Sequence, residues 1–180
     1  MPPVRPLSGD STEPSAPFRA DAAAATVPAM EPDLEVSRDI AAPPSAVFAA
    51  LTDVTRMGEW SPETHTAAWK DGHDAAALGA EFEGHNRNGE FEWTTEAVIV
   101  DLVPDERFFF DCKVGDYVFA SWGYVIEPTD GGCRVTECWQ DHRTDDVKAL
   151  GSAISGVDDR PSHNRAGMER TLEALAAAVE

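Results

Sequence analysis

Glu137 is the residue of this sequence best placed to transfer a proton. It lies between Val135 and Trp139 at alternating positions, so the three side chains share one face of the strand that the pattern predicts. If that face is the inner one, desolvation among aromatic rings disfavours the charged carboxylate and moves its pKa toward neutral pH. A carboxyl group of this kind can donate or accept a proton during a reaction. We therefore treat Glu137 as a candidate catalytic residue.

Two non-catalytic roles for Glu137 are also compatible with the sequence. The carboxylate could form an ion pair with a buried arginine such as Arg87 or Arg165, which would make it structural. A strand register displaced by one residue would instead turn Glu137 to solvent.

Tyr124 and Asn86 are the polar residues that could assist Glu137. Asn86 shares the parity of Phe82 and Gly84, so an inward Asn86 could hold a ligand carbonyl or hydroxyl group. The competing interpretation is turn chemistry, because Asn86 lies beside the Asn88-Gly89 turn and such side chains often bind backbone groups.

Large apolar side chains recur at alternating positions of the expected strands, so one face of the sheet can be mainly aromatic. These side chains could line a pocket for a ligand or simply fill a core. Both interpretations stay open. The candidate ligand-binding residues are Trp60, Phe82, Trp93, Phe108, Phe110, Trp122, Trp139 and Met168.

The sequence lacks the motifs of several other chemistries. It has no G-x-S-x-G nucleophile motif, no phosphate-binding Walker loop and no G-x-G-x-x-G. Its five histidines lack metal-ligand spacing, and its three cysteines, an odd number without C-x-x-C spacing, predict neither a zinc site nor a disulfide framework. We expect no metal and no cofactor.

Composition restricts the partners and the location of the protein. Acidic residues number 33 against 14 Lys and Arg, and the formal charge of −19 repels nucleic acid and anionic lipid surfaces. No apolar run approaches the roughly 20 residues of a spanning helix, and no signal-peptide pattern begins the chain. We expect a cytoplasmic protein without membrane insertion, either a monomer or a homodimer.

The first 32 residues predict a disordered tail, because they hold seven of the thirteen prolines and show no helical or strand periodicity. Translation from Met1 and translation from Met30 are both open. Residues 33–180 are expected to form one domain.

Alternation over 33–40 predicts a first strand, and Pro43 and Pro44 then begin a short helix. A second short helix follows Asp53 and ends before Pro62. Turn signals divide the next stretch into six strands, which are expected at 65–70, 80–87, 90–102, 107–114, 117–127 and 133–142. No crossover helix separates these strands, so antiparallel pairing is expected.

A lid-like short helix or loop is expected between Asp145 and Gly156. Pro161 then begins a long helix with an apolar stripe that must lie on the sheet. The stripe consists of Met168, Leu172, Leu175 and Val179. This order of elements predicts an α+β fold in which a twisted sheet of about seven strands curls around the last helix.

Several local patterns resemble the SRPBCC superfamily, also called START-like or helix-grip proteins, and within it the polyketide cyclase/dehydratase-like branch. The resemblance covers 33–180 and is carried by IAAPPSAVF at 40–48, LTD at 51–53, WSPE at 60–63, GAEFEG at 79–84, NR at 86–87, WGY at 122–124, EP at 127–128, GGCRVTE at 131–137 and GMERTL at 167–172. It implies a curved antiparallel sheet wrapped around a long C-terminal helix, with a hydrophobic pocket between the two.

Three functions are compatible with that resemblance. The first is binding of an apolar or aromatic small molecule, polyketide-like or lipid-like. The second is a cofactor-independent cyclase or dehydratase in which Glu137 moves protons, assisted by Tyr124 and Asn86. The third is a protein-interaction module similar to the co-chaperone members of the superfamily.

Overall fold

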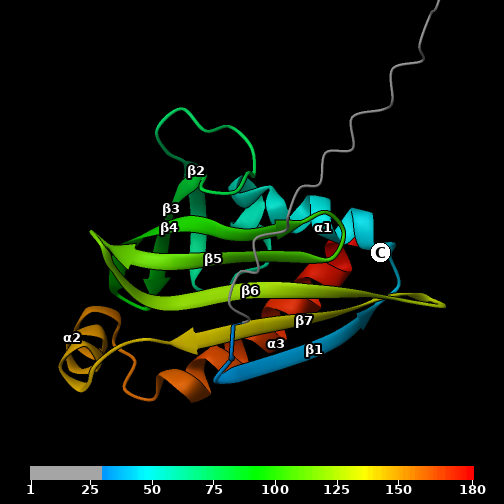
Figure 1. Cartoon of the computed structure of the whole chain (residues 1–180). Helices are drawn as coiled ribbons and strands as arrows, with labels where there is room; N and C mark the ends of the chain where they lie inside the picture. Colours follow the sequence, from blue (N-terminus) through cyan, green and yellow to red (C-terminus); the bar gives the residue numbers. More distant parts are fainter. Residues whose placement is uncertain (1–29) are drawn as a thin grey trace, which may run out of the picture.

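Within residues 30–180, seven strands form a single antiparallel sheet, as predicted, and their order is β1-β7-β6-β5-β4-β3-β2. The computed structural model describes residues 30–180, so most of the predicted tail lies outside the described residues. The strands are β1 (Leu34–Ile40), β2 (Thr64–Trp69), β3 (Glu81–Asn88), β4 (Phe91–Val103), β5 (Arg107–Val114), β6 (Tyr117–Thr129) and β7 (Gly132–Asp141). The first strand of the chain therefore pairs with the last one (Figure 1).

Four helical segments of the described part of the chain accompany the sheet. They are α1 (Pro44–Thr52), η1 (Val54–Glu59), α2 (Asp145–Ser155) and α3 (Arg160–Val179). The second predicted short helix is η1, a 3-10 helix. Asp159 caps α3, because its side chain accepts a hydrogen bond from the backbone N–H of Ser162 at 3.1 Å. No helix of the part described, residues 30–180, is long and apolar enough to cross a membrane.

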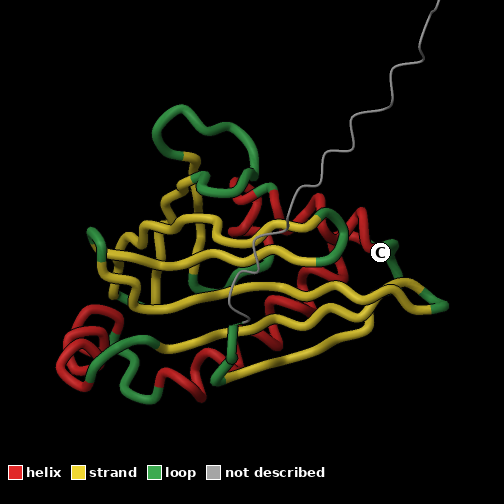
Figure 2. Tube along the Cα trace, viewed as in Figure 1, coloured by secondary structure: helices red, strands yellow, loops and turns green. Residues whose placement is uncertain are grey.

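The long helix α3 packs on one face of the twisted sheet, against β1 and β7 (Figures 1 and 2). Its apolar stripe is the predicted one: Met168, Leu172 and Leu175 are fully buried, and Val179 at the end of the helix is half-buried against the core. The sheet face below this stripe carries the residues of even number on β5 and β6 and of odd number on β7, including Phe108, Tyr124 and Val135. The hydrophobic core therefore lies between α3 and this inner face.

Candidate functional site

Glu137 and Tyr124 lie opposite each other on β7 and β6 and point to the inner face. Tyr124 donates a hydrogen bond from its hydroxyl to Oε1 of Glu137 over 3.0 Å. Both side chains are buried, with 4% of Glu137 and 7% of Tyr124 exposed. The two residues form a buried carboxyl–phenol pair on the second and third strands of the sheet.

Burial sets the protonation of this pair. Desolvation raises the pKa of Glu137 from 4.5 to about 8, against the smaller lowering effect of the Tyr124 hydrogen bond. Desolvation and the neighbouring Glu137 together raise the pKa of Tyr124 well above 10. Near neutral pH, Glu137 is therefore mainly a neutral carboxylic acid and Tyr124 a neutral phenol. Glu137 can exchange a proton in this range, whereas Tyr124 serves as a hydrogen-bond donor.

The other carboxyl oxygen, Oε2 of Glu137, is buried and has no hydrogen-bond partner among residues 30–180. Buried polar atoms are nearly always paired in folded proteins, because an unpaired one loses its hydration without compensation. The neutral acid therefore has an O–H group that can donate a hydrogen bond to an oxygen atom of a ligand.

Asn164 of α3 has the same property, since its Nδ2 is the other buried side-chain atom of the described residues without a partner. Asn164 is 4% exposed and lies one turn before Met168, on the stripe that faces the sheet. Asn164 was not among the predicted site residues. Its spacing of four from Met168 and eight from Leu172 was the available signal, because it places an amide on an otherwise apolar stripe.

Neither non-catalytic role considered for Glu137 agrees with the structure. The partner of Glu137 is Tyr124, while Arg87 pairs with Glu92 and Arg165 is exposed, so the predicted ion pair with a buried arginine is wrong. The burial of Glu137 between Val135 and Trp139 also excludes the displaced register.

Asn86 is buried on β3, but the structure separates it from Glu137 by the intervening strands β4, β5 and β6. Its Oδ1 accepts a hydrogen bond from the hydroxyl of Thr64, and its Nδ2 donates to the hydroxyl of Thr95 and the carbonyl of Gly84. Both ends of the amide are therefore satisfied. These contacts tie β2, β3 and β4 together and favour a structural role for Asn86.

The predicted aromatic residues follow the inner face in two groups. Phe82, Phe110 and Phe108 form a continuous series of ring contacts that ends at Tyr124, with centroids 5.2, 5.5 and 6.4 Å apart. Trp122 and Trp139 form a second pair, 6.1 Å apart, directly beside the Tyr124–Glu137 pair along β6 and β7. The rings nearest the carboxyl group are those of Tyr124, which is its hydrogen-bond partner, and of Trp139, two residues further along the same face of β7.

The remaining predicted residues lie at the edges of this region. Met168 faces it from α3 and is 1% exposed. Trp60 is buried just after η1, and Arg56 stacks over its ring at 5.4 Å. Trp93 on β4 is half-buried, and the guanidinium of Arg160 lies 6.0 Å from its ring centroid. Trp93 therefore lies near the N-terminus of α3.

A hollow of about 390 Å³ opens where the segment before β2, the β3–β4 turn and α3 meet. Its lining is polar and includes none of the residues predicted to bind a ligand. Glu63, at its centre, joins the segment before β2 to α3 by accepting from Arg160 Nη1 at 2.7 Å and pairing with His163 Nε2 at 3.2 Å.

The loss of a proton from buried Glu137 should make folding stability depend on pH. The unfolded side chain ionises near 4.5 and the folded one near 8, so the native state binds the extra proton between these values and stability falls as pH rises through them. We expect the free energy of unfolding of wild type, relative to Glu137→Gln, to fall by roughly 1.4 kcal/mol per pH unit across this window. Urea melts of both proteins at pH 5, 6, 7 and 8 measure this difference. A constant difference would contradict the neutral acid.

Comparison with known proteins relates this geometry to one family. A family model described as polyketide cyclase / dehydrase and lipid transport matches residues 31–180. None of the curated proteins matches the chain. Among solved structures, the Polyketide_cyc-like protein Cgl2372 from Corynebacterium glutamicum is 30% identical with a TM-score of 0.54, over 79% of this chain and 88% of that one.

Two more distant structures share the fold. Protein CV1439 from Chromobacterium violaceum is 20% identical with a TM-score of 0.62, over 82% of this chain and 96% of that one. The di-domain ARO/CYC StfQ from the steffimycin biosynthetic pathway is 15% identical with a TM-score of 0.62, over 81% of this chain and 49% of that one. This chain thus spans about half the length of StfQ.

Proposed function

Because the chain belongs to the polyketide cyclase / dehydrase and lipid transport family, we propose that it binds an apolar or aromatic small molecule between the inner face of the sheet and α3. The observation that carries this proposal is the pair of buried polar atoms without partners, Glu137 Oε2 and Asn164 Nδ2, on the two elements that enclose the core. Apolar ligand sites are typically lined by aromatic rings and carry a few polar groups that fix orientation. The ligand supplies the missing partners.

The donors specify one feature of this ligand. A neutral Glu137 and the Asn164 amide both offer hydrogen atoms, so a bound molecule must present oxygen acceptors such as ketone, quinone or hydroxyl oxygens. A pure hydrocarbon would leave both atoms unsatisfied, at a cost of about 1 to 3 kcal/mol for each. The expected ligand is therefore mainly apolar and oxygenated.

A fluorescent ketone, 6-propionyl-2-(dimethylamino)naphthalene, tests this proposal, because it is neutral, aromatic and carries one carbonyl acceptor. We expect saturable binding with emission shifted to the blue, and an affinity about 5- to 20-fold lower for Asn164→Leu, since one charge-free hydrogen bond is lost. Glu169→Gln, on the exposed side of α3, is the matched control and should bind as wild type does. Emission that stays as in buffer would contradict the proposal.

A second function, catalysis of dehydration or cyclisation, is favoured by one specific observation, the Glu137 pKa of about 8. A carboxyl group that titrates near working pH can take a proton and give it back. In the dehydration of a β-hydroxy ketone, ionised Glu137 removes the proton on the α-carbon, and the electron pair forms the new double bond as the β carbon–oxygen bond breaks. Glu137 then gives that proton to the departing hydroxyl, which leaves as water.

A further inference from the structure

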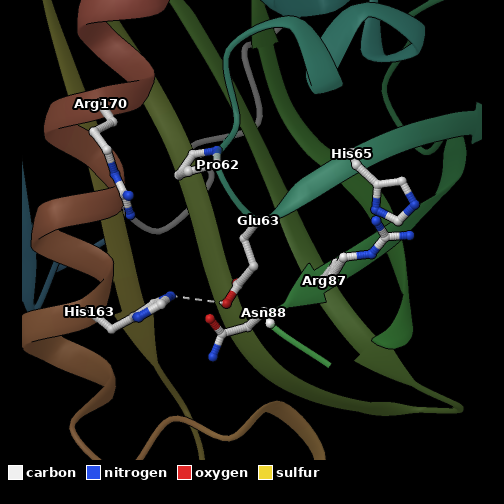
Figure 3. A pocket seen from close by; sticks show the side chains of 8 residues that line it. Pro62, Glu63, His65, Arg87, Asn88, His163 and Arg170 are labelled. Atoms are coloured by element: carbon white, nitrogen blue, oxygen red, sulfur yellow. Dashed lines mark ion pairs between the residues drawn. The ribbon is translucent and has the colours of Figure 1, made fainter. Parts of the chain in front are cut away.

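The hollow between the β3–β4 turn and α3 gathers basic side chains in an acidic protein (Figure 3). Four of its lining residues can carry positive charge, namely His65, Arg87, His163 and Arg170, and one lining residue, Glu63, carries negative charge. We infer that this hollow binds a small anionic group, a carboxylate or a phosphate.

The one carboxylate in the hollow is already neutralised. Glu63 accepts a hydrogen bond from Arg160 over 2.7 Å, and its carboxylate lies 3.2 Å from Nε2 of His163; Arg160 and His163 both come from the first turn of α3. Figure 3 shows His163 reaching from the helix to Glu63. Because Arg160 balances Glu63, the charge that remains in the hollow is positive.

Arg170 is the group most available to an anion. It lies seven residues after His163, two turns further along the same side of α3. Gly167 lies between them and has no side chain. The nearest atom to the position that a Cβ of residue 167 would occupy is Cγ of Pro62, at 3.7 Å. The Nε of Arg170 donates to the carbonyl of Ala166, and within residues 30–180 its guanidinium forms no ion pair. Its terminal N–H groups therefore remain for a ligand.

Arg87 and His65 approach from the other side of the hollow, from β3 and β2 (Figure 3). Arg87 forms an ion pair with Glu92, but the two side chains are 55% and 63% exposed. An ion pair so exposed contributes little, so an anion in the hollow can share this guanidinium. Arginine forks match the geometry of carboxylate and phosphate oxygens, which makes either group a suitable ligand.

The negative net charge of the protein disfavours anion binding elsewhere on its surface, so an anion is expected to bind only where positive side chains gather. A formal charge of −19 repels anions over most of the surface, so an anion held here must be held by the local groups. Among the residues that line the hollow, two arginines, Arg87 and Arg170, meet one carboxylate, Glu63. The hollow is thus locally positive, in contrast to the molecule as a whole.

Titration with inorganic phosphate at constant ionic strength, followed by nitrogen–proton NMR, tests the site directly. We expect saturable shifts confined to the residues around Gly89, His163 and Arg170, and an affinity at least about 5-fold lower in Arg170→Gln. Arg165→Gln removes the same charge from an exposed position of α3 outside the hollow and should leave the affinity within about 2-fold of wild type. Shifts that do not saturate, or an equal loss in both variants, would overturn the inference.

A second titration distinguishes a free anion from the acidic head group of an amphipathic ligand. The head-group alternative rests on the proposed function, because it assumes that the protein binds an apolar molecule. Dodecanoate and methyl dodecanoate share one chain and differ in charge. If the hollow holds a head group, the acid should bind about 5-fold more tightly than the ester despite the net negative charge, and phosphate should compete with it. Equal binding of the two, with saturable phosphate, assigns the hollow to a free anion. Saturable phosphate without binding of either amphiphile rejects the head-group assignment and leaves the anion site supported, while the ketone titration decides the proposed function separately.

Discussion

Met168→Asp should unfold the protein or reduce it to a state without fixed tertiary packing. Met168 is 1% exposed on the stripe of α3 that lies on the sheet, and it is surrounded by Leu172 and other core residues. An aspartate there would bury a charge with no cationic partner, and the change also removes apolar packing. We expect a loss of more than about 4 kcal/mol, a large share of the roughly 5 to 15 kcal/mol that typically stabilises a domain.

Circular dichroism and urea melts measure this loss. Met168→Leu keeps the volume and should cost less than about 1.5 kcal/mol, so it separates the charge from the change in shape. Glu169→Asp, one residue further on the exposed side, should be nearly neutral. If Met168→Asp melted as wild type does, the buried face of α3 would be wrongly assigned and the site between α3 and the sheet would have no basis.

The inner face of the sheet could be predicted because strand parity and turn chemistry act locally. Alternation placed Val135, Glu137 and Trp139 on one face, and the structure buries all three. The pairing of Tyr124 with Glu137 could also have been predicted. The Asp130-Gly131 turn pairs Thr129 with Gly132, and counting back along both strands from this pair places Tyr124 opposite Glu137. A two-residue turn therefore fixes the proton-carrying pair.

The contacts between distant segments could not be predicted in this way. Glu63 meets Arg160 and His163 only because the segment before β2 reaches the beginning of α3, 97 residues further along the chain for Arg160. No local pattern specifies that approach, which depends on how the sheet curls. For Asn86 the predicted inward orientation was correct. The hydrogen-bond partners of its amide, Thr64 and Thr95, lie on neighbouring strands and could not be predicted from the local sequence.

The aromatic residues show a further limit of sequence patterns. Alternation predicts which rings face inward, but core filling and ligand contact require the same apolar residues at the same positions. The structure shows the rings of Phe82, Phe110 and Phe108 in contact with one another, as a core would have them. Our proposal of a binding site instead of a closed core rests on the polar atoms of Glu137 and Asn164, because buried polar groups without partners destabilise a core.

Glu137→Gln should separate a catalyst from a carrier. Near neutral pH Glu137 is mainly a neutral acid, so glutamine keeps its size, its lack of charge and an oxygen that accepts from Tyr124. We therefore expect affinity for the fluorescent ketone to stay within a few-fold of wild type at about pH 6.5. If Glu137 carries the proton in dehydration, turnover of 4-hydroxy-4-phenylbutan-2-one to its conjugated ketone should fall by roughly 100-fold or more, because an amide cannot exchange that proton.

Tyr124→Phe is the matched variant for this measurement, because it keeps the ring and removes the hydrogen bond that lowers the pKa of Glu137. In an enzyme whose base is ionised Glu137, the rise of turnover with pH should move to higher pH in Tyr124→Phe and should vanish in Glu137→Gln. Ultraviolet absorbance of the conjugated product measures all three proteins. Turnover retained in Glu137→Gln would remove Glu137 from the chemistry. Ketone binding without turnover in wild type would instead identify a carrier, in which the acid and Asn164 only orient the ligand.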